Sequence, residues 1–235
     1  MGLSGAIIRL MTMTSPSARR LKERGSRDLW LDAAYQALIE GGVDSVRIQV
    51  LSDRLNLSRT SFYWFFESRE ELLEALLDRW EQTNTRGFVA AAEAYAETPA
   101  EAALNLLACF IVGQQFDAGF EFAVRSWALQ SDDTMERVRR ADETRMEALR
   151  VMLRGFGFDE IDADVRARTI YLVQIGYISM QTRETVATRL ARVAAYVRIY
   201  TGTEATPSEM ARFLAPFGYR LGDDGQPAPV KRGTG

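Results

Sequence analysis

The stretch RIQVLSDRLNLSRTSFYWFFESR, residues 47–69, decides how the first part of this chain folds. Its apolar residues recur twice at helical spacing with a break between the runs, as Ile48, Leu51 and Leu55 and then as Leu57, Phe62 and Phe66. Asn56 stands at the break, and asparagine tolerates the left-handed conformation that ends many helices. Ser58 follows as an N-cap, because its hydroxyl is placed to accept from a backbone N–H two or three residues on. The spacing therefore predicts a helix-turn-helix.

The second helix of this pair predicts a surface that reads DNA. With Phe62 and Phe66 assigned to the core, the side chains left facing water are Arg59, Thr60, Ser61, Tyr63 and Trp64. Arginine matches a guanine edge in a bidentate contact, and hydroxyl groups match phosphate oxygens. The alternative is that Tyr63 and Trp64 pack on a neighbouring helix, which is the commoner fate of an isolated aromatic pair. The tight turn and Arg59 favour the DNA-reading surface.

The same stretch, continued to Trp80, resembles the recognition helix and the following helix of the TetR (tetracycline repressor) family of bacterial transcriptional regulators. The matching positions are Ser58, Ser61, Phe62, Tyr63, Phe66, Ser68 and Arg69, and the resemblance covers about residues 26–80. Three positions depart from the family pattern. Arg47 stands where Ser or Thr usually caps the first helix, Val50 replaces a common acidic residue, and Phe65 lacks the polar tip of the usual His or Tyr.

This resemblance implies an all-α fold, in which an N-terminal three-helix DNA-binding domain precedes a larger helical domain for ligand binding and dimerisation. The residues expected to contact double-stranded operator DNA are Arg47, Gln49, Ser58, Arg59, Thr60, Ser61, Tyr63, Trp64 and Arg69. Within this set we expect Arg59 to reach a base edge, whereas Tyr63 and Arg69 hold phosphates.

The composition argues against an enzyme. The 235 residues include no His and a single Cys, so the usual general bases, nucleophiles and zinc ligands are nearly absent. We expect no catalytic site, no metal site and no cofactor. Cys109 lies in an apolar helical context, which is typical of a core residue in a reducing cytoplasm. No apolar run reaches the ~18 residues of a membrane span, and the opening residues lack the charged leader of a secretory signal. We therefore expect a cytoplasmic, nucleoid-associated protein without membrane contact.

Charge is distributed unevenly along the chain. Residues 1–69 hold ten Lys and Arg against seven Asp and Glu, whereas residues 70–235 hold 19 against 25. The basic excess is sharpest in Arg19, Arg20, Lys22, Arg24 and Arg27, a cluster suited to phosphates or to a minor groove. The equally favoured alternative is a solvated arm without contacts.

Cap signals divide the chain into domains. Ser26 opens a helix that ends at Gly41 and Gly42, and three capping-box patterns begin at Ser68, Thr98 and Thr206. Helices are expected at about 100–117, 120–130, 133–154, 159–180 and 185–200, with no strands. The predicted organisation is a disordered basic arm over 1–25, a helix-turn-helix domain over 26–68, a helical regulatory and dimerisation domain over 69–221, and a disordered tail over 222–235.

Two sets of residues in the helical domain are expected to form a subunit interface and an effector pocket. The last two long helices have apolar faces that need a partner, and the resemblance implies that they pair with those of a second subunit. The residues expected at this interface are Ile175, Ile178, Leu190, Val193, Val197 and Tyr200. The alternative is that these helices bury each other within one subunit. An effector pocket, implied by the resemblance, is expected to be lined by Phe110, Phe116, Trp127 and Tyr171. Aromatic residues at helical spacing are more often core than pocket.

Two functional hypotheses remain at this stage. The first is a ligand-responsive repressor that binds a palindromic operator as a homodimer and is released by a largely apolar small molecule. The second is a DNA-binding interaction protein whose acidic helical body docks a protein partner. A helical enzyme would need a catalytic constellation that the sequence does not provide.

Overall fold

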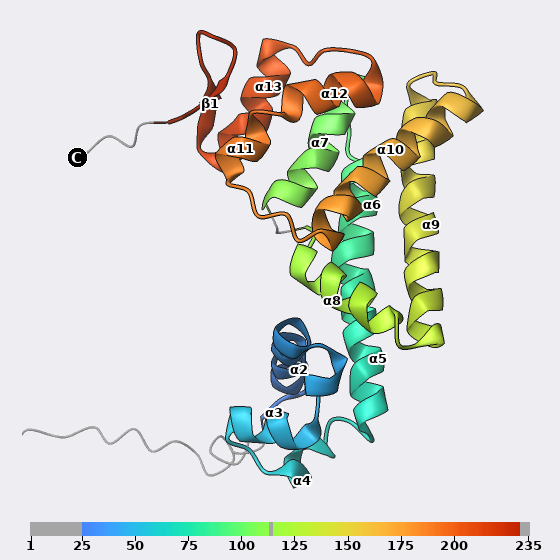
Figure 1. The fold of residues 1–235 in the computed structure, drawn as a ribbon, viewed down its shortest axis with the longest axis vertical. Helices are drawn as coiled ribbons and strands as arrows, with labels where there is room; N and C mark the ends of the chain where they lie inside the picture. The colour runs from blue at the N-terminus through green and yellow to red at the C-terminus, as the bar shows by residue number, and fades with distance from the viewer. Residues whose placement is uncertain (1–24, 113–114, 231–235) are drawn as a thin grey trace, which may run out of the picture. The chain divides into compact units, whose positions relative to one another are not determined.

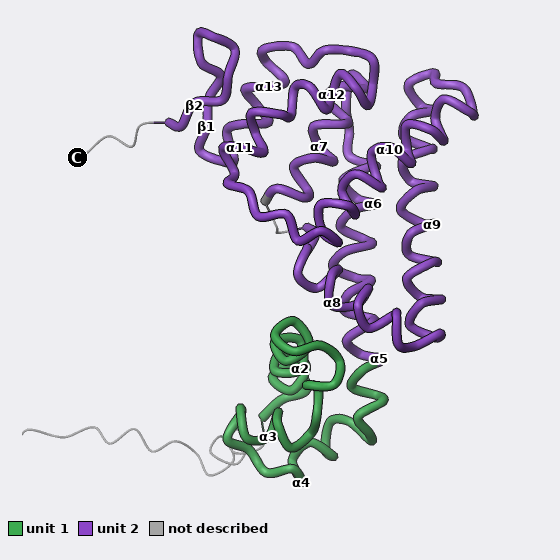
Figure 2. Tube along the Cα trace, in the orientation of Figure 1, with its two compact units in different colours: residues 1–73 green, residues 74–235 purple. Residues whose placement is uncertain are grey.

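The computed structural model describes residues 25–112 and 115–230, and it confirms the all-α class (Figure 1). The chain divides into two compact units, residues 1–73 and residues 74–235 (Figure 2). The boundary falls inside α5 (Arg69–Trp80), five residues after the boundary predicted between residues 68 and 69. The basic arm predicted for residues 1–25 lies outside the described residues, except for Gly25. Among the described residues, no helix combines the length and the apolar character needed to cross a membrane.

The first unit is a three-helix domain followed by the start of α5. Its elements are α2 (Arg27–Gly41), the 3-10 turn η1 (Val43–Ser45), α3 (Ile48–Leu55) and α4 (Arg59–Phe62). The predicted caps are confirmed: Ser26 accepts from the Leu29 N–H, and Ser58 accepts from the Ser61 N–H. Asn56 ends α3 in the left-handed conformation, with φ of 52°. These local signals place α4 directly after α3, as the helix-turn-helix spacing predicts.

The second unit is a body of helices around α7 (Pro99–Val112), on which α6 (Arg86–Ala92), α12 (Val193–Thr201) and α13 (Pro207–Leu214) pack. A helix covered on several sides must be apolar around most of its circumference, and α7 carries the run ALNLLACFIV. The remaining elements are η2 (Glu81–Thr85), α8 (Ala118–Ala128), α9 (Asp132–Gly155), α10 (Glu160–Ser179), α11 (Val186–Leu190) and η3 (Ala215–Phe217). In Figure 1, α9 and α10 lie side by side.

One helix expected over residues 185–200 is instead two, α11 and α12. The residues between them keep near-helical torsions, but the Arg192 N–H bonds to the Arg189 carbonyl, three residues back rather than four, at 3.1 Å. This tighter turn interrupts the α-helical ladder. The apolar periodicity continues across the break, so the sequence pattern does not reveal it.

The disordered tail predicted for residues 222–235 is wrong for its described part. Strands β1 (Tyr219–Leu221) and β2 (Pro227–Pro229) pair in antiparallel register, with Arg220 opposite Ala228. The turn between them is held by Gly225, whose φ is 74°, and by the Asp224 carboxylate, which accepts from the Gln226 N–H at 3.0 Å. Gly, Asp and Pro therefore mark a tight hairpin turn here, rather than disorder.

Candidate functional site

The surface of α4 carries most of the predicted DNA-reading side chains. Arg59 and Thr60 are exposed, and directly after α4 the residues Tyr63 and Trp64 are 57% and 52% exposed. Both aromatic side chains thus face outward, as the DNA-reading interpretation predicts, rather than filling the core of this unit. Large exposed aromatic side chains beside a cation suit a ligand that offers stacked rings and phosphates.

The position of α4 is set by an aromatic core beneath it. The Phe62 ring meets Trp30 edge-on at 5.3 Å between centroids and stacks on Phe66 at 5.5 Å. All three are buried, and the Arg27 guanidinium lies over the Phe66 ring at 4.7 Å. Because Phe62 lies on α4 itself, this packing fixes which face of the short helix looks outward.

The prediction that Ser61 faces outward is wrong. Ser61 is 1% exposed, and its hydroxyl donates to the Ser58 carbonyl at 2.7 Å. Its backbone N–H donates to the Ser58 hydroxyl, so Ser61 donates two bonds to Ser58 that tighten the first turn of α4. Serine competes for nearby backbone groups in this way, which explains why a hydroxyl that matches DNA chemistry turns inward.

The Arg69 side chain, which the sequence predicts to hold a phosphate, bonds instead to two backbone carbonyls. Its Nε donates to the Val46 carbonyl at 2.6 Å, and its Nη2 donates to the Val43 carbonyl at 2.8 Å. The guanidinium therefore ties the start of α5 to the connection before α3, within the first unit. Arg47 and Gln49 are exposed at that edge, where the Arg47 Nε donates to the Asp44 carbonyl at 2.7 Å and the Gln49 amide donates to Asp53 at 2.8 Å.

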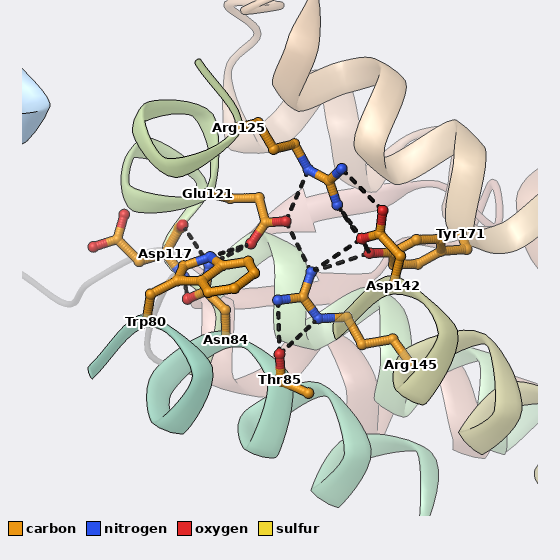
Figure 3. A network of polar contacts seen from close by, with 9 residues as sticks. All are labelled: Trp80, Asn84, Thr85, Asp117, Glu121, Arg125, Asp142, Arg145 and Tyr171. Carbon is orange, nitrogen blue, oxygen red and sulfur yellow. Dashed lines mark hydrogen bonds and ion pairs between the residues drawn. The ribbon is translucent and has the colours of Figure 1, made fainter. Parts of the chain in front are cut away.

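The helical body holds a buried ionic network that the sequence analysis missed (Figure 3). Glu121 and Arg145 are both fully buried, and the Arg145 Nη1 donates to the Glu121 carboxylate at 2.8 Å. The second cation, Arg125, donates to Glu121 at 2.9 Å and makes a two-nitrogen contact with Asp142. The Tyr171 hydroxyl donates to Asp142 at 2.6 Å. Two carboxylates thus face two guanidiniums, which balances the formal charge of the network.

A local irregularity of the helix supplies further partners. η2 (Glu81–Thr85) is a π-helical turn between α5 and α6, and within it Asn84 is fully buried. The Asn84 amide donates to Glu121 at 2.9 Å, and the Trp80 indole donates to the same carboxylate at 2.7 Å. Thr85 accepts from the Arg145 Nε at 3.1 Å. π-helical turns often occur at functional sites. Here the turn brings the Asn84 amide to Glu121, so the buried carboxylate has further hydrogen-bond partners.

Electrostatics keeps this network charged. Burial on its own raises the pKa of Glu121, but the Arg145 and Arg125 guanidiniums outweigh burial and hold that pKa below its ordinary value. Burial likewise opposes the charged form of Arg145, whereas Glu121 raises the pKa of its guanidinium. Both groups therefore carry charge at neutral pH. No cluster of metal-ligating residues is found in the described residues.

The four residues predicted to line an effector pocket are buried in this body. Phe110 lies against Phe116, with ring centroids 4.8 Å apart, and Phe88 contacts both Phe110 and Tyr171 edge-on. Trp127 is buried on α8. The structure therefore brings Phe110, Phe116 and Tyr171 together through Phe88, and the Tyr171 hydroxyl belongs to the ionic network.

Most residues predicted for a subunit interface are already covered within one chain. Leu190, Val193, Val197 and Tyr200 are almost fully buried, and Ile178 is buried beside them. For Val193, Val197 and Tyr200 the physical reason is that the apolar stripe of α12 packs on α7. These five side chains are not available to a second subunit, so the interface prediction is wrong for them. Ile175 is half-buried.

A different set of apolar residues remains exposed on the same two helices. Leu172 of α10 is 59% exposed and Ile199 of α12 is 62% exposed, and Val165 and Met180 are also exposed. The two helices contact each other, because the Tyr177 and Tyr196 hydroxyls bond at 2.9 Å and Arg166 donates to the Tyr200 carbonyl at 2.8 Å. Val165 and Leu172 are seven residues apart, which places them on one face of α10, and Met180 follows directly after the last residue of this helix.

Comparison with known proteins connects the first unit with a family of regulators. Residues 31–76 match the model of the bacterial regulatory proteins of the tetR family. Helix-turn-helix transcriptional repressors of Mycobacterium tuberculosis are 30% identical over 69 residues, which is 28% of this chain and 26% of theirs. The match thus spans about a quarter of the length of these curated relatives.

Solved structures extend the likeness to the body. Salmonella enterica GusR is 15% identical, with a TM-score of 0.54 over 79% of this chain and 98% of that one. A transcriptional regulator of the TetR/AcrR family from Thermobifida fusca is 16% identical, with a TM-score of 0.52 over 77% of this chain and 98% of that one. At these identities the likeness is one of fold.

Proposed function

We propose a function from the premise that this chain belongs to the tetR family of bacterial regulatory proteins. It is a transcriptional repressor that binds a palindromic operator as a homodimer and leaves the operator when a small molecule binds the helical body. The observation that carries this proposal is the exposed surface formed by Arg59 and Thr60 of α4 and by Tyr63 and Trp64 directly after it, above a buried aromatic core.

The geometry supports different roles along this surface. Arg59 begins α4, and residues at the start of a recognition helix are those that reach base edges. We assign base reading to Arg59 and phosphate contacts to the Ser58, Thr60 and Tyr63 hydroxyls. Trp64 supplies an apolar contact, and Arg47 and Gln49 flank the surface at the start of α3. Arg69 is assigned to holding the unit together, because its guanidinium is occupied by two carbonyls.

Dimerisation is proposed through the exposed face of α10 and α12. Val165, Leu172, Met180 and Ile199 are large apolar side chains in contact with water on two adjacent helices, and such a patch gains free energy when a second copy covers it. A twofold arrangement would place the same face of each subunit against the other. The effector is proposed to bind the body, with Phe110, Phe116, Trp127 and Tyr171 retained as the lining expected from the sequence.

The test of DNA reading is a titration of variants against a randomised half-site library at two salt concentrations. Arg59→Ala should cost about 1–3 kcal/mol per half-site and relax the preference at one base-pair position, as expected when a bidentate contact is lost. The matched control is Arg139→Ala, because Arg139 is an exposed cation on α9. An unchanged preferred sequence in the Arg59 variant would contradict the assignment.

Assembly is tested by measuring the molecular mass of the protein in analytical ultracentrifugation. Leu172→Glu combined with Ile199→Glu should give monomers that keep their helical content and lose most operator affinity, because one subunit makes half of the contacts. Leu129→Glu is the control, because Leu129 is an exposed leucine at the end of α8. A double variant that remains dimeric rules out this face as the interface.

A further inference from the structure

Two adjoining grooves run between α9 and the helix formed by α5, η2 and α6. The first has a volume of 630 Å³, and the second has a volume of 860 Å³. Both are lined by Arg140 and Thr144, so they meet at this pair. The first groove is bordered by charged residues of α5 and η2, whereas the second is bordered by Val89, Ala92, Ala148, Val151 and Met152. The result is a channel that changes from polar to apolar along its length.

Within the described part of the chain, some charged side chains of the channel are paired in salt bridges, and others are not. In the polar half, Arg137 pairs with Glu74, Asp78 and Glu81 at 2.8–2.9 Å. In the apolar half, Glu143 and Glu147 pair with Arg150 at 2.7 and 3.0 Å.

Two exposed cations border the polar half, and one of them, Arg140, also borders the apolar half. Neither Arg86 nor Arg140 has a carboxylate partner among the residues that the structure describes, and both border the polar half. Glu93, also exposed, borders the apolar half. Arg140 and Val151 are eleven residues apart on α9, which corresponds to roughly 16 Å along a helix.

We propose that this channel binds an elongated molecule with one anionic end and an apolar tail, of the class of straight-chain carboxylates. The carboxylate contacts Arg140 and Arg86, where a guanidinium offers paired donors to two oxygens. The tail lies along Val89, Ala148 and Val151, where it removes exposed apolar surface from water. This site is distinct from the buried aromatic residues Phe110, Phe116 and Tyr171. The inference stands independently of the repressor function, since binding is measured on the protein without DNA.

The experiment is a calorimetric titration of the full chain with sodium dodecanoate below its micelle concentration. We expect saturable binding with one site per chain, and tighter binding than that of octanoate, by up to about fourfold for each methylene buried. Dodecyltrimethylammonium carries the same tail with the opposite charge, and it should bind at least about tenfold more weakly. Arg140→Gln should weaken dodecanoate by about tenfold or more, as expected for a lost charge-assisted contact.

Matched variants separate the site from general effects. Arg139→Gln removes the neighbouring exposed cation of α9, which does not border the channel, and should leave dodecanoate affinity unchanged. Val151→Glu places a charge along the tail and should weaken dodecanoate, whereas Leu129→Glu should not. The four substituted side chains are all exposed, so far-UV circular dichroism should show folded protein in each variant. They are Arg139, Arg140, Val151 and Leu129.

Four results would overturn the proposal. The first is the absence of saturable dodecanoate binding, and the second is equal affinity for the carboxylate and the trimethylammonium compound. The third is a fall in sedimentation mass of Val151→Glu alone, because the channel would then be covered by a second copy of the chain. Equal losses in Arg140→Gln and Arg139→Gln would also exclude a site centred on Arg140.

Discussion

The first unit and the helical body use charged side chains in opposite ways. In residues 25–73, aromatic rings fill the core while Arg59, Thr60 and Tyr63 stay at the surface. In residues 74–230, a fully buried Glu121 and Arg145 lie inside the core, with Arg125 and Asp142 beside them. The first arrangement keeps charge available for a ligand outside the protein. In the second arrangement the charged groups bind each other, and they constrain how the helices of the body pack.

The largest expected effect comes from breaking the buried pair. Arg145→Met should lower the free energy of unfolding by about 3–5 kcal/mol, because Glu121 loses its buried partner and remains surrounded by low-dielectric protein. Urea unfolding at neutral pH measures this loss. Arg139→Met, the exposed control on the same helix, should change stability by less than about 0.5 kcal/mol.

A double variant separates the loss of one buried charge from the loss of both. Glu121→Leu combined with Arg145→Met removes both buried charges, and should recover part of the stability lost in Arg145→Met. If the single variant at Arg145 loses no more than its exposed control, the network does not stabilise the body.

The next effect concerns the first unit. Arg69→Lys keeps the positive charge but not the paired donors, so the Val43 and Val46 carbonyls should lose their partner at a cost of about 1.5–3 kcal/mol. Hydrogen exchange of the amides over residues 43–55 should accelerate. Arg47→Lys is the control, because Arg47 is exposed and bonds a single nearby carbonyl. Unchanged exchange in the Arg69 variant would return Arg69 to the role of a phosphate contact predicted from sequence.

A third effect appears only in acid. Because folding lowers the pKa of Glu121, this carboxylate contributes stability that is fully present above its unfolded pKa near 4.5. The contribution is lost as pH falls through the lower pKa of the folded protein. Within that window the unfolded chain binds the proton and the native chain does not, so stability rises with pH. Glu121→Gln should reduce the slope of unfolding free energy against pH by up to about 1.4 kcal/mol per unit.

The smallest effect isolates a single hydroxyl of the DNA-reading surface. Tyr63→Phe keeps the ring and removes the hydroxyl, so it should weaken operator binding by about 0.5–1.5 kcal/mol per half-site. The dependence of affinity on salt should stay nearly the same, because the lost group is uncharged. Equal titrations of the wild type and the variant would place the Tyr63 hydroxyl away from phosphate.

The sequence predicts the first unit well because its signals are local. Asn56 and Ser58 define the turn within a few residues, and Phe62 and Phe66 define the inner face of the following segment. The outward position of Tyr63 and Trp64 follows from that assignment. Ser61 escapes the prediction because helical periodicity does not say whether a hydroxyl bonds to water or to a backbone carbonyl one turn away.

The chemistry of the body depends on partners distant in sequence. Glu121 meets Arg145 across 24 residues and Trp80 across 41, and each lies in a helix whose spacing is typical of a solvated face or an ordinary core. The π-helical turn that inserts Asn84 has no marker in the residue pattern. Likewise, the apolar stripe of Val193 and Val197 indicates a buried face, but it does not say whether the cover is α7 or a second chain.

The C-terminal hairpin has a consequence for the protein at high concentration. Backbone bonds from Val230 to Gly218 and from Gly222 to Gln226 mark alternate residues of the ladder, so the N–H of Ala228 points toward β1. The two positions whose N–H would point away from β1 are Pro227 and Pro229, and proline has none. The outer edge of β2 therefore offers no row of donors on which another chain can add a strand, and edge-to-edge pairing along β2 is disfavoured.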